Sequence, residues 1–455
     1  MTAHRTVLFW FRRDLRLHDQ GALAAALGSG TTHLVPVHCQ PPAGEATPWG
    51  FARRGPHRRA FEGAALRDLA AGMTRLGNPL LQCQGQPAAV LPALARAVGA
   101  TTVVCEEIAA PHEQAEVAAL RTAGLQVQTV WHSSLLQPCD LPWPVGDLPG
   151  VFTTFRQAVE QAGIQPPQPL PAPAALLPPP AALTDAVWQA VLHTAGAAGA
   201  VGAAQGQGGP GGEVEVGEGA GCDMRSSFPY GTPACDGGET AALAHVQQYL
   251  ASGQAHTYKA TRNGLTGLGY SSKFSPWLAT GALSARHAMA ALRRFESTHG
   301  ANEGTYWLWF ELLWRDYFRL LHLQHGRTLY RARGLSAQPL APHNAPGFAR
   351  WCAGNTGQPL VDAALRELAA TGYLSNRLRQ VAASYLIHEL QGDWRAGAAW
   401  FESQLVDYDP YSNQGNWLYI AGRGTDPRGG RRFNPAKQTQ DHDADGSYRR
   451  LWGTA

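Results

Sequence analysis

The feature that most constrains this chain is a change in its hydrophobic pattern between the two halves. Up to about residue 135, short β-rich runs alternate with stretches of helical spacing. The runs cover 7–11, 33–37, 80–83, 102–105 and 127–131, and the helical stretches cover 21–27, 61–76, 90–98 and 113–120. Such alternation predicts parallel strands joined by helices, which is a doubly wound α/β domain over residues 1–135. No GxGxxG follows the first run, which argues against a Rossmann dinucleotide site there.

The remaining chain divides into a linker and a helical domain. Residues 136–235 start Pro-rich and become Gly/Ala-rich, and the tract 196–221 has almost no large side chains, so we expect a poorly ordered linker. Residues 236–455 show helical spacing, most clearly at 240–250, 285–295, 306–323, 362–370, 375–390 and 396–405. The second domain is therefore predicted to be all-α and large enough to enclose a large ligand.

Cysteine usage and charge narrow the functional classes. The seven cysteines are scattered without a CxxC pair, which favours a reducing compartment and argues against a structural metal or a disulfide framework. The first apolar run is too short for a signal peptide or a membrane span, so we expect a cytoplasmic protein, nucleoid-associated in a bacterium. Residues 236–455 contain 23 Lys and Arg residues and 17 Asp and Glu residues. This mild excess fits a polyanionic partner and equally fits chance variation in surface charge.

The stretch 407–417 has an unusual density of polar groups. Asp407, Asp409, Asn413 and Asn416 lie close together in an otherwise apolar and aromatic region. Pro410 and Gly415 disfavour regular structure, which predicts a tight loop leading into a helix. Its polar groups need partners, and a ligand with ring nitrogens, carbonyls and hydroxyls would satisfy them. The alternative is a surface turn with a helix N-cap.

Three further stretches of the helical half are rich in polar side chains. The first, 270–276, contains Ser271, Ser272, Lys273 and Ser275 before a helix start, which suits either a phosphate cradle or a capping box without a ligand. In the second, Glu311, Trp314 and Arg315 share a helix face. Glu311 and Arg315 suit either a solvated surface ion pair or, beside the indole of Trp314, a half-buried site. In the third, Asn376, Arg379 and Gln380 share a face, and Arg379 is a plausible partner for a carboxylate of the 407–409 stretch.

Together these stretches resemble the photolyase/cryptochrome family, and its DASH-type cryptochromes in particular. The matching motifs are the opening residues 8–16, Tyr258-Lys259-x-Thr261-Arg262-Asn263-Gly264-Leu265, residues 270–278, Trp314-Arg315-Asp316-Tyr317-Phe318-Arg319 and Ser375-Asn376-Arg377. Gln380 and Tyr419 also resemble DASH proteins, at positions where photolyases acting on duplex DNA commonly have Met and Trp.

The resemblance implies a U-shaped FAD inside the helical domain. The residues implied to hold it are Tyr258, Ser271, Ser272, Lys273, Phe274, Ser275, Arg315, Asn376, Arg379, Asp407, Asp409 and Asn413. Asn413 would face the flavin N5, where an amide tolerates a reduced, anionic flavin and a carboxylate would repel it.

The resemblance also implies a substrate, namely cyclobutane pyrimidine dimers in single-stranded or looped DNA, where extruding the lesion costs little. The catalytic residues implied are Glu311, Trp314, Asn376 and Asn413. The DNA contacts implied are Arg262, Trp314, Arg377, Gln380, Tyr419, Arg431 and Arg432. Each of these arginines, taken alone, also fits an ordinary surface charge.

Photoreduction of the flavin in this family usually runs along three tryptophans. Trp417 and Trp394 match the first two, whereas the third position holds Ala341. Another aromatic residue would then carry the electron, and Trp351 and Tyr373 both remain candidates.

The resemblance further implies an antenna pigment in the N-terminal domain, most often 5,10-methenyltetrahydrofolate. Glu113 matches a pterin-binding carboxylate, although it also fits an exposed glutamate at a helix start. The function implied is a monomeric, light-driven lyase that repairs pyrimidine dimers. The alternative is a blue-light signalling photoreceptor with little or no repair activity, and the expected absence of a long C-terminal tail favours the enzyme.

Overall fold

The N-terminal part of the protein contains one six-stranded sheet. The structure is a computed structural model that describes residues 5–453, except for 29, 43, 200–222, 341, 427 and 428. The strand order is β5-β4-β1-β2-β3-β6, in which β6 alone is antiparallel to its neighbour among the described strands. The strands are β1 (Thr6–Phe11), β2 (His33–Gln40), β3 (Leu81–Gln84), β4 (Thr102–Glu106), β5 (Gln126–Val130) and β6 (Ala198–Gly199).

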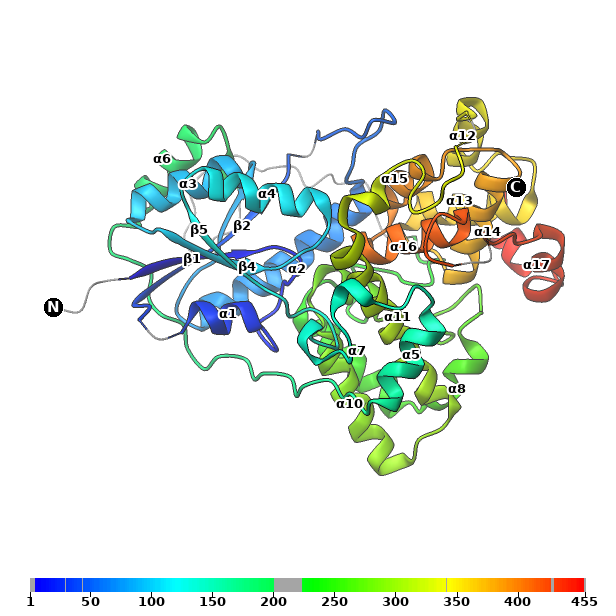
Figure 1. The fold of residues 1–455 in the computed structure, drawn as a ribbon, viewed down its shortest axis with the longest axis horizontal. Coiled ribbons are helices and arrows are strands. Elements are labelled where there is room, and N and C mark those ends of the chain that lie inside the picture. The colour runs from blue at the N-terminus through cyan, green and yellow to red at the C-terminus, as the bar shows by residue number, and fades with distance from the viewer. Residues whose placement is uncertain are drawn as a thin grey trace.

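Helices cover both faces of this sheet (Figure 1). They are α1 (Gly21–Ala26), α2 (Pro56–Arg75), α3 (Pro87–Val98) and α4 (Pro111–Thr122). Successive side chains of a strand point to opposite faces. Phe9 and Phe11 of β1 accordingly join the apolar core with α1 and α2, whereas Leu8 and Trp10 join the core with α3 and α4. The predicted doubly wound sheet is confirmed, and its strands read as continuous apolar runs because both faces are covered.

The C-terminal half is helical. Its helices are α7 (Glu239–Ala251), α8 (Gln254–Thr261), α9 (Ser275–Thr280), α10 (Ala285–His299), α11 (Glu303–His325), α12 (Ala345–Cys352), α13 (Pro359–Thr371), α14 (Asn376–His388), α15 (Trp394–Gln404), α16 (Pro410–Ala421), α17 (Pro435–His442) and α18 (Ser447–Trp452). The six helices that we predicted here are confirmed, as is the helix start near Pro276, which is α9, whereas the short α8, α12, α17 and α18 were not predicted. None of the described helices combines the length and apolarity that a membrane crossing requires.

The central helix α11 starts at a capping box and crosses α16 closely. Asn302 accepts a hydrogen bond from the Thr305 N–H at 3.1 Å, and Thr305 Oγ1 accepts one from the Asn302 N–H at 3.0 Å. At the crossing, a Cβ added to Gly415 would lie 2.1 Å from the ring of Phe318. The prediction that Gly415 interrupts regular structure is therefore wrong, because this glycine lies inside α16 and allows the two helices to approach.

The segment between the two halves contains regular structure. Besides the short 3-10 helices η1 (Pro138–Asp140) and η2 (Val145–Asp147), it contains α5 (Phe152–Gln161), which packs on α11, and α6 (Asp185–Thr194), which packs on α3. Figure 1 shows α5 among the C-terminal helices and α6 beside the sheet. Most of the Gly/Ala-rich tract lies outside the described residues, and the domain boundaries at 135 and 235 stay predictions.

Candidate active site

A large cavity lies among the helices of the C-terminal half. It contains about 2000 Å³ of empty space, part of which is open to solvent. Most of the predicted site residues line it: Tyr258, Arg262, Ser271, Ser272, Lys273, Phe274, Ser275, Glu311, Trp314, Arg315, Asn376, Arg379, Gln380, Asp407, Asp409 and Tyr419. A smaller cavity of about 520 Å³ shares Arg379 and Asp407 with it and adds Asn413 and Trp417. Residues from five helices and two loops therefore meet around one space.

An ion pair joins two walls of the large cavity. Arg379 Nη2 on α14 donates to Asp407 Oδ2 at 2.8 Å, and the same oxygen accepts a hydrogen bond from Ser275 Oγ at 2.7 Å. The Asp407 side chain is 1 % exposed. Burial disfavours the charged guanidinium, but Asp407 outweighs this effect and raises the pKa of Arg379. The predicted pairing of Arg379 with a carboxylate of the 407–409 stretch is confirmed.

Asp409 caps the helix that follows it. Its Oδ1 accepts a hydrogen bond from the Ser412 N–H at 2.7 Å, and α16 begins at Pro410, a favoured residue for the first helical turn. Burial favours the neutral carboxyl, but nearby Arg315 and Arg319 hold the pKa of Asp409 below its ordinary value. The predicted loop thus ends at Asp409, and the residues from Pro410 onward present their polar groups from a helix.

Several buried polar atoms on the cavity wall have no hydrogen-bond partner within the described residues. They are Lys273 Nζ, Tyr270 Oη and Asp407 Oδ1. Lys273 is 3 % exposed and lies 3.3 Å from the centroid of the Tyr270 ring. Burial lowers the pKa of Lys273 well below its ordinary value, although Glu367 opposes the shift. Unpaired buried polar groups are costly, so this cavity fits a ligand with many donors and acceptors, as FAD has.

The backbone of Lys273 adopts an unusual conformation. Its φ is 55°, in the left-handed region that non-glycine residues seldom occupy. Strain of this kind persists where the surroundings impose it, commonly at ligand sites. The loop 270–274 is thereby held against the cavity just before α9 begins at Ser275.

Glu311 and Arg262 form an ion pair on the wall of the same cavity. Arg262 Nη1 contacts Glu311 Oε1, and the guanidinium carbon of Arg262 lies 4.2 Å from the centroid of the Trp307 ring. The Glu311 side chain is 32 % exposed. Burial raises the pKa of Glu311, and the opposing charge of Arg262 offsets this only in part. Glu311, a residue implied for catalysis, and Arg262, a residue implied for DNA contact, are thus paired with each other in this structure.

Trp314 is held by an aromatic neighbour that we did not predict. Phe152 stacks on it with 3.7 Å between ring centroids and 15° between planes, while Tyr419 lies at 6.2 Å. Phe152 belongs to α5, inside the segment that we expected to be a linker. The helical spacing of Phe152, Phe155 and Val159 was the signal available in the sequence. Stacking of this kind fixes the orientation of an indole ring.

Arg315 lines the large cavity and Asn413 lines the smaller one, and each side chain donates a hydrogen bond to a backbone carbonyl. Arg315 Nη1 donates to Ser133 O at 2.6 Å, and Asn413 Nδ2 donates to Ala398 O at 3.0 Å. These bonds fix the position of the guanidinium and the amide before any ligand binds. Of the predicted electron carriers, Trp417 lines the smaller cavity, and Trp394 is buried in the same apolar cluster. Ala341 lies outside the described residues.

The other arginines implied for DNA lie away from the lining of the large cavity, and each has a partner. Arg377 Nη2 donates to Asn263 Oδ1 at 3.0 Å, and Arg431 Nη2 pairs with Asp426 at 2.8 Å. Arg432 is 70 % exposed and lies 3.6 Å from Glu389. Their contacts with DNA stay predictions.

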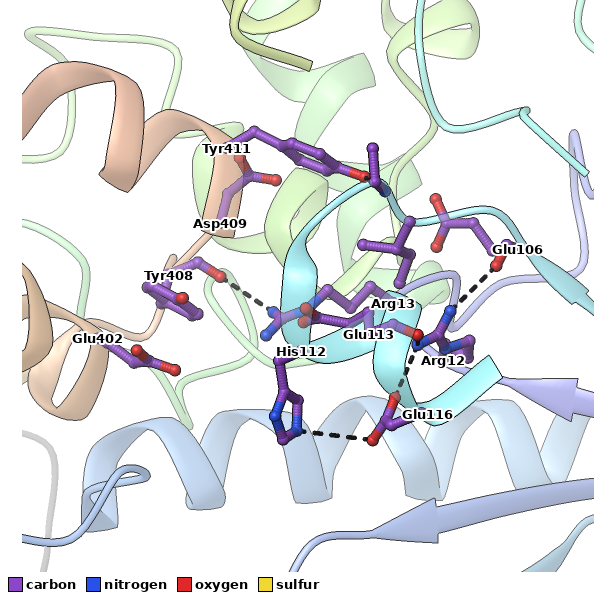
Figure 2. A network of polar contacts seen from close by, with 12 residues as sticks. Arg12, Arg13, Glu106, His112, Glu113, Glu116, Glu402, Tyr408, Asp409 and Tyr411 are labelled. Carbon is purple, nitrogen blue, oxygen red and sulfur yellow. Dashed lines mark hydrogen bonds and ion pairs between the residues drawn. The ribbon is translucent and has the colours of Figure 1, made fainter. Parts of the chain in front are cut away.

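Glu113 lies in a different cavity, at the carboxyl ends of β1 and β2 in the N-terminal half. It is buried, so the interpretation as an exposed helix-start glutamate is wrong. Figure 2 shows it beside Arg12 and Arg13, with Arg12 paired to Glu116 at 2.7 Å. Burial raises the pKa of Glu113, but Arg13 and Arg12 outweigh this and hold it below the ordinary value. Glu113 is thus a charged member of a paired network.

Comparisons with known proteins agree with this architecture. A family model described as "FAD binding domain of DNA photolyase" matches residues 307–454, and one described as "DNA photolyase" matches residues 7–174. The cryptochrome DASH of Gloeobacter violaceus is 41 % identical over 98 % of this chain and 85 % of its own length. A crystal structure of a Synechocystis cryptochrome superposes with a TM-score of 0.87 at 39 % identity, covering 99 % of this chain and 89 % of the other. A crystal structure of a bacterial class III photolyase from Agrobacterium tumefaciens superposes with a TM-score of 0.76 at 28 % identity, covering 99 % of this chain and 87 % of the other.

Proposed function

Because this chain belongs to the photolyase/cryptochrome family, with DASH cryptochromes among its relatives, we propose that it repairs cyclobutane pyrimidine dimers in light, preferentially in single-stranded DNA. Family membership by itself supports FAD binding and a light-dependent role in DNA repair or photoreception. The observation that carries the finer proposal is that Glu311, Trp314 and Tyr419 share one cavity with the Arg379–Asp407 pair. A dimer and a cofactor held by these two groups of residues would be neighbours.

The chain's own residues would hold the cofactor through fixed polar groups. Bound FAD, reduced and excited by blue light, would supply one electron to the dimer and recover it after the cyclobutane ring opens. Lys273, Tyr270 and Asp407 have buried polar atoms available for it, and Asn413 and Arg315 are already oriented by backbone carbonyls. The apolar and aromatic part of the wall limits access of water to the charge that develops there.

Glu311 would hold the dimer. A carboxyl whose pKa is raised by partial burial donates a proton in a hydrogen bond more readily than an ordinary glutamate, and such a bond stabilises negative charge on a dimer carbonyl. To serve in this way Glu311 must exchange Arg262 for the substrate, and a DNA phosphate is a natural new partner for Arg262. Trp314, positioned by Phe152, and Tyr419 supply surfaces on which bases stack. Single-stranded DNA delivers an unstacked lesion at the lowest cost.

The test is repair of a dimer-containing oligothymidylate by the reduced protein in light, followed as recovery of thymine absorption. Glu311→Ala should lower the repair rate on the order of 10²-fold, because it removes a bond made to developing charge, and should leave flavin bound. Glu303→Ala, on the same helix but with its side chain 80 % exposed, is the matched control and should repair normally. Absence of repair by the wild type on single strands would contradict the lyase function and favour signalling. Loss of flavin in Glu311→Ala would contradict the role of Glu311.

We also propose an antenna pigment, methenyltetrahydrofolate, near Glu113. The observation that supports it is a cavity with about 810 Å³ of empty space, lined by Glu113 and open in part to solvent. Glu113 is already engaged with Arg13 (Figure 2), so a pterin would have to share this carboxylate. An absorption spectrum of the purified protein, compared with that of Glu113→Gln, tests it. A spectrum that contains only flavin in both proteins would contradict the antenna.

A further inference from the structure

Trp417, on the wall of the smaller cavity, is in ring contact with two buried aromatic residues. Its ring centroid lies 6.3 Å from that of Trp351 on α12 and 5.1 Å from that of Phe401 on α15. Trp351 is fully buried and Trp417 is 2 % exposed. A glycine makes room for this arrangement, since a Cβ added to Gly397 would lie 2.2 Å from the Trp417 ring.

The ring contacts continue from Trp351 towards solvent. Phe348, one turn earlier on α12, stacks on Trp351 at 6.0 Å with 22° between the planes. Phe348 in turn lies 6.4 Å from Trp49, which comes from the loop before α2 in the N-terminal half. Trp49 is half-buried and therefore meets water. Four rings from three separate parts of the chain thus form a continuous path from the cavity wall to the surface.

The other aromatic candidates are placed differently. Trp394 is buried and donates its indole N–H to Ala332 O at 3.0 Å, but the ring contacts of the described residues include none between Trp394 and Trp417. Tyr373 packs against Phe228 at 5.5 Å in the other apolar cluster, close to Lys273. Of the two candidates that the sequence left open, only Trp351 touches Trp417.

We propose that Trp351 and Trp49 form the electron-supply route of this protein, with Phe348 between them and Trp417 at its inner end. The proposal rests on the proposed function, because the acceptor is the flavin of the cavity. It assigns Trp351 the second place in the route, next to Trp417, and it assigns Trp49 of the N-terminal half the outer place that Ala341 leaves open.

The balance of electrons and protons favours an outlet at Trp49. One electron leaves Trp417 for the cofactor. One electron then passes from Trp351 to Trp417, and one passes from Trp49 to Trp351. The electron vacancy, which is the oxidised state of the indole, therefore ends on Trp49. The Trp351 N–H donates to Ala382 O at 3.0 Å, and a carbonyl is too weak a base to remove that proton, so the vacancy is not trapped there. Trp49 releases its indole proton to water. An external thiol then returns one electron and one proton, and two oxidised thiols combine as a disulfide.

Variants of the flavin-loaded protein test the route, with the photoreduction rate in the presence of a thiol as the first readout. Trp351→Phe should lower this rate about tenfold or more, because phenylalanine is much harder to oxidise than tryptophan. Trp49→Phe should lower the photoreduction rate as well. Because Trp49 is half-buried, this second variant keeps the core intact and tests the route even if Trp351→Phe folds poorly. Trp188→Phe, in the N-terminal half and remote from these rings, is the control and should match the wild type.

A second readout does not depend on turnover. After illumination in air without thiol, where dioxygen adds to the indole radical, peptide mass spectrometry should find the oxygenated indole at Trp49 and not at Trp188, and Trp351→Phe should abolish the product at Trp49. Wild-type rates and unchanged Trp49 oxidation in Trp351→Phe, with a strong loss in Trp394→Phe, would overturn the route. Failure of the proposed function looks different, because the wild type would then contain no flavin or would photoreduce normally yet repair no dimer.

Discussion

Two cavities of this protein are lined by charged side chains, one mainly by the N-terminal half and one by the helical half, but they differ in how completely their polar groups are paired. In the N-terminal cavity the arginines face glutamates: Arg12 pairs with Glu116, Arg13 with Glu113, Arg53 with Glu402, and Arg54 and Arg58 with Glu62. In the C-terminal cavity, Lys273 and one oxygen of Asp407 have no hydrogen-bond partner among the described residues. The charges of the first network are paired with one another, so a ligand there would have to share them, whereas the second set gains partners from a ligand.

Two further carboxyl groups, Glu62 and Glu367, differ in pKa according to their partners. Burial raises the pKa of Glu62, but Arg54 and Arg58 outweigh it and bring it well below the ordinary value. In the helical half, burial dominates and raises the pKa of Glu367 to about 8, although Tyr448 and Lys273 oppose it. Paired carboxylates therefore stabilise the N-terminal half at neutral pH, and an underpaired one destabilises the helical half there. The comparison teaches that charge content alone does not identify a ligand site, and that buried polar atoms without partners are the stronger indication.

Asp407→Asn should have the largest effect, and it tests whether the cavity of the helical half binds a ligand. The substitution leaves half-buried Arg379 without its counter-charge, which costs on the order of 3–5 kcal/mol, and it removes a carboxylate that lines the cavity. We expect loss of flavin, measured as flavin absorbance per protein after reconstitution. Arg293→Ala, which removes a partly exposed pair with Glu296, is the control and should keep its flavin.

A milder variant guards against misfolding of Asp407→Asn. Ser275→Ala removes one hydrogen bond to the same carboxylate and should weaken flavin binding while the fold persists, as judged by far-UV circular dichroism. Full flavin content in both variants would contradict the assignment of this cavity.

Glu62→Gln tests the N-terminal network. Without this carboxylate Arg54 and Arg58 remain unpaired, so we expect a loss of about 3 kcal/mol in the free energy of unfolding at pH 7. The folded pKa lies below the unfolded value of 4.5, so the stabilisation is present above that pH and disappears as the pH falls. Denaturant titrations at pH 7 and pH 4 should show the wild-type advantage shrinking. An equal difference at both values would mean that lost packing, and not charge, explains the effect.

Glu367→Gln should change the pH dependence of stability with the opposite sign. Between the unfolded value of 4.5 and about 8, the folded carboxyl keeps a proton that the unfolded one has lost. Wild-type stability should therefore fall with rising pH over this range, by up to about 1.4 kcal/mol per pH unit. The variant should show a flatter slope between pH 5 and pH 8 in thermal melts. Parallel slopes for the two proteins would show that Glu367 titrates normally.

Much of the fold was predictable because its signals are local. The apolar run of β1 is buried on both faces, and a run of that kind identifies a strand of a covered parallel sheet. The face shared by Glu311, Trp314 and Arg315 follows from helical periodicity, and all three residues line one cavity. The pairing of Arg379 with a carboxylate of the 407–409 stretch was also predicted, and the structure shows that this carboxylate is Asp407.

What only the tertiary structure decided are the contacts between distant elements. The stack of Phe152 on Trp314, the closure of Arg262 on Glu311 and the approach of Trp49 to Phe348 each depend on where helices cross. One such crossing is set by Gly415, which in the sequence looked like an interruption. Hydrogen-bond periodicity and capping are encoded within a few neighbouring residues, whereas crossing positions depend on how whole surfaces fit together. Many of the residues that line the cavity were therefore predictable from the sequence, whereas their partners followed only from the packed molecule.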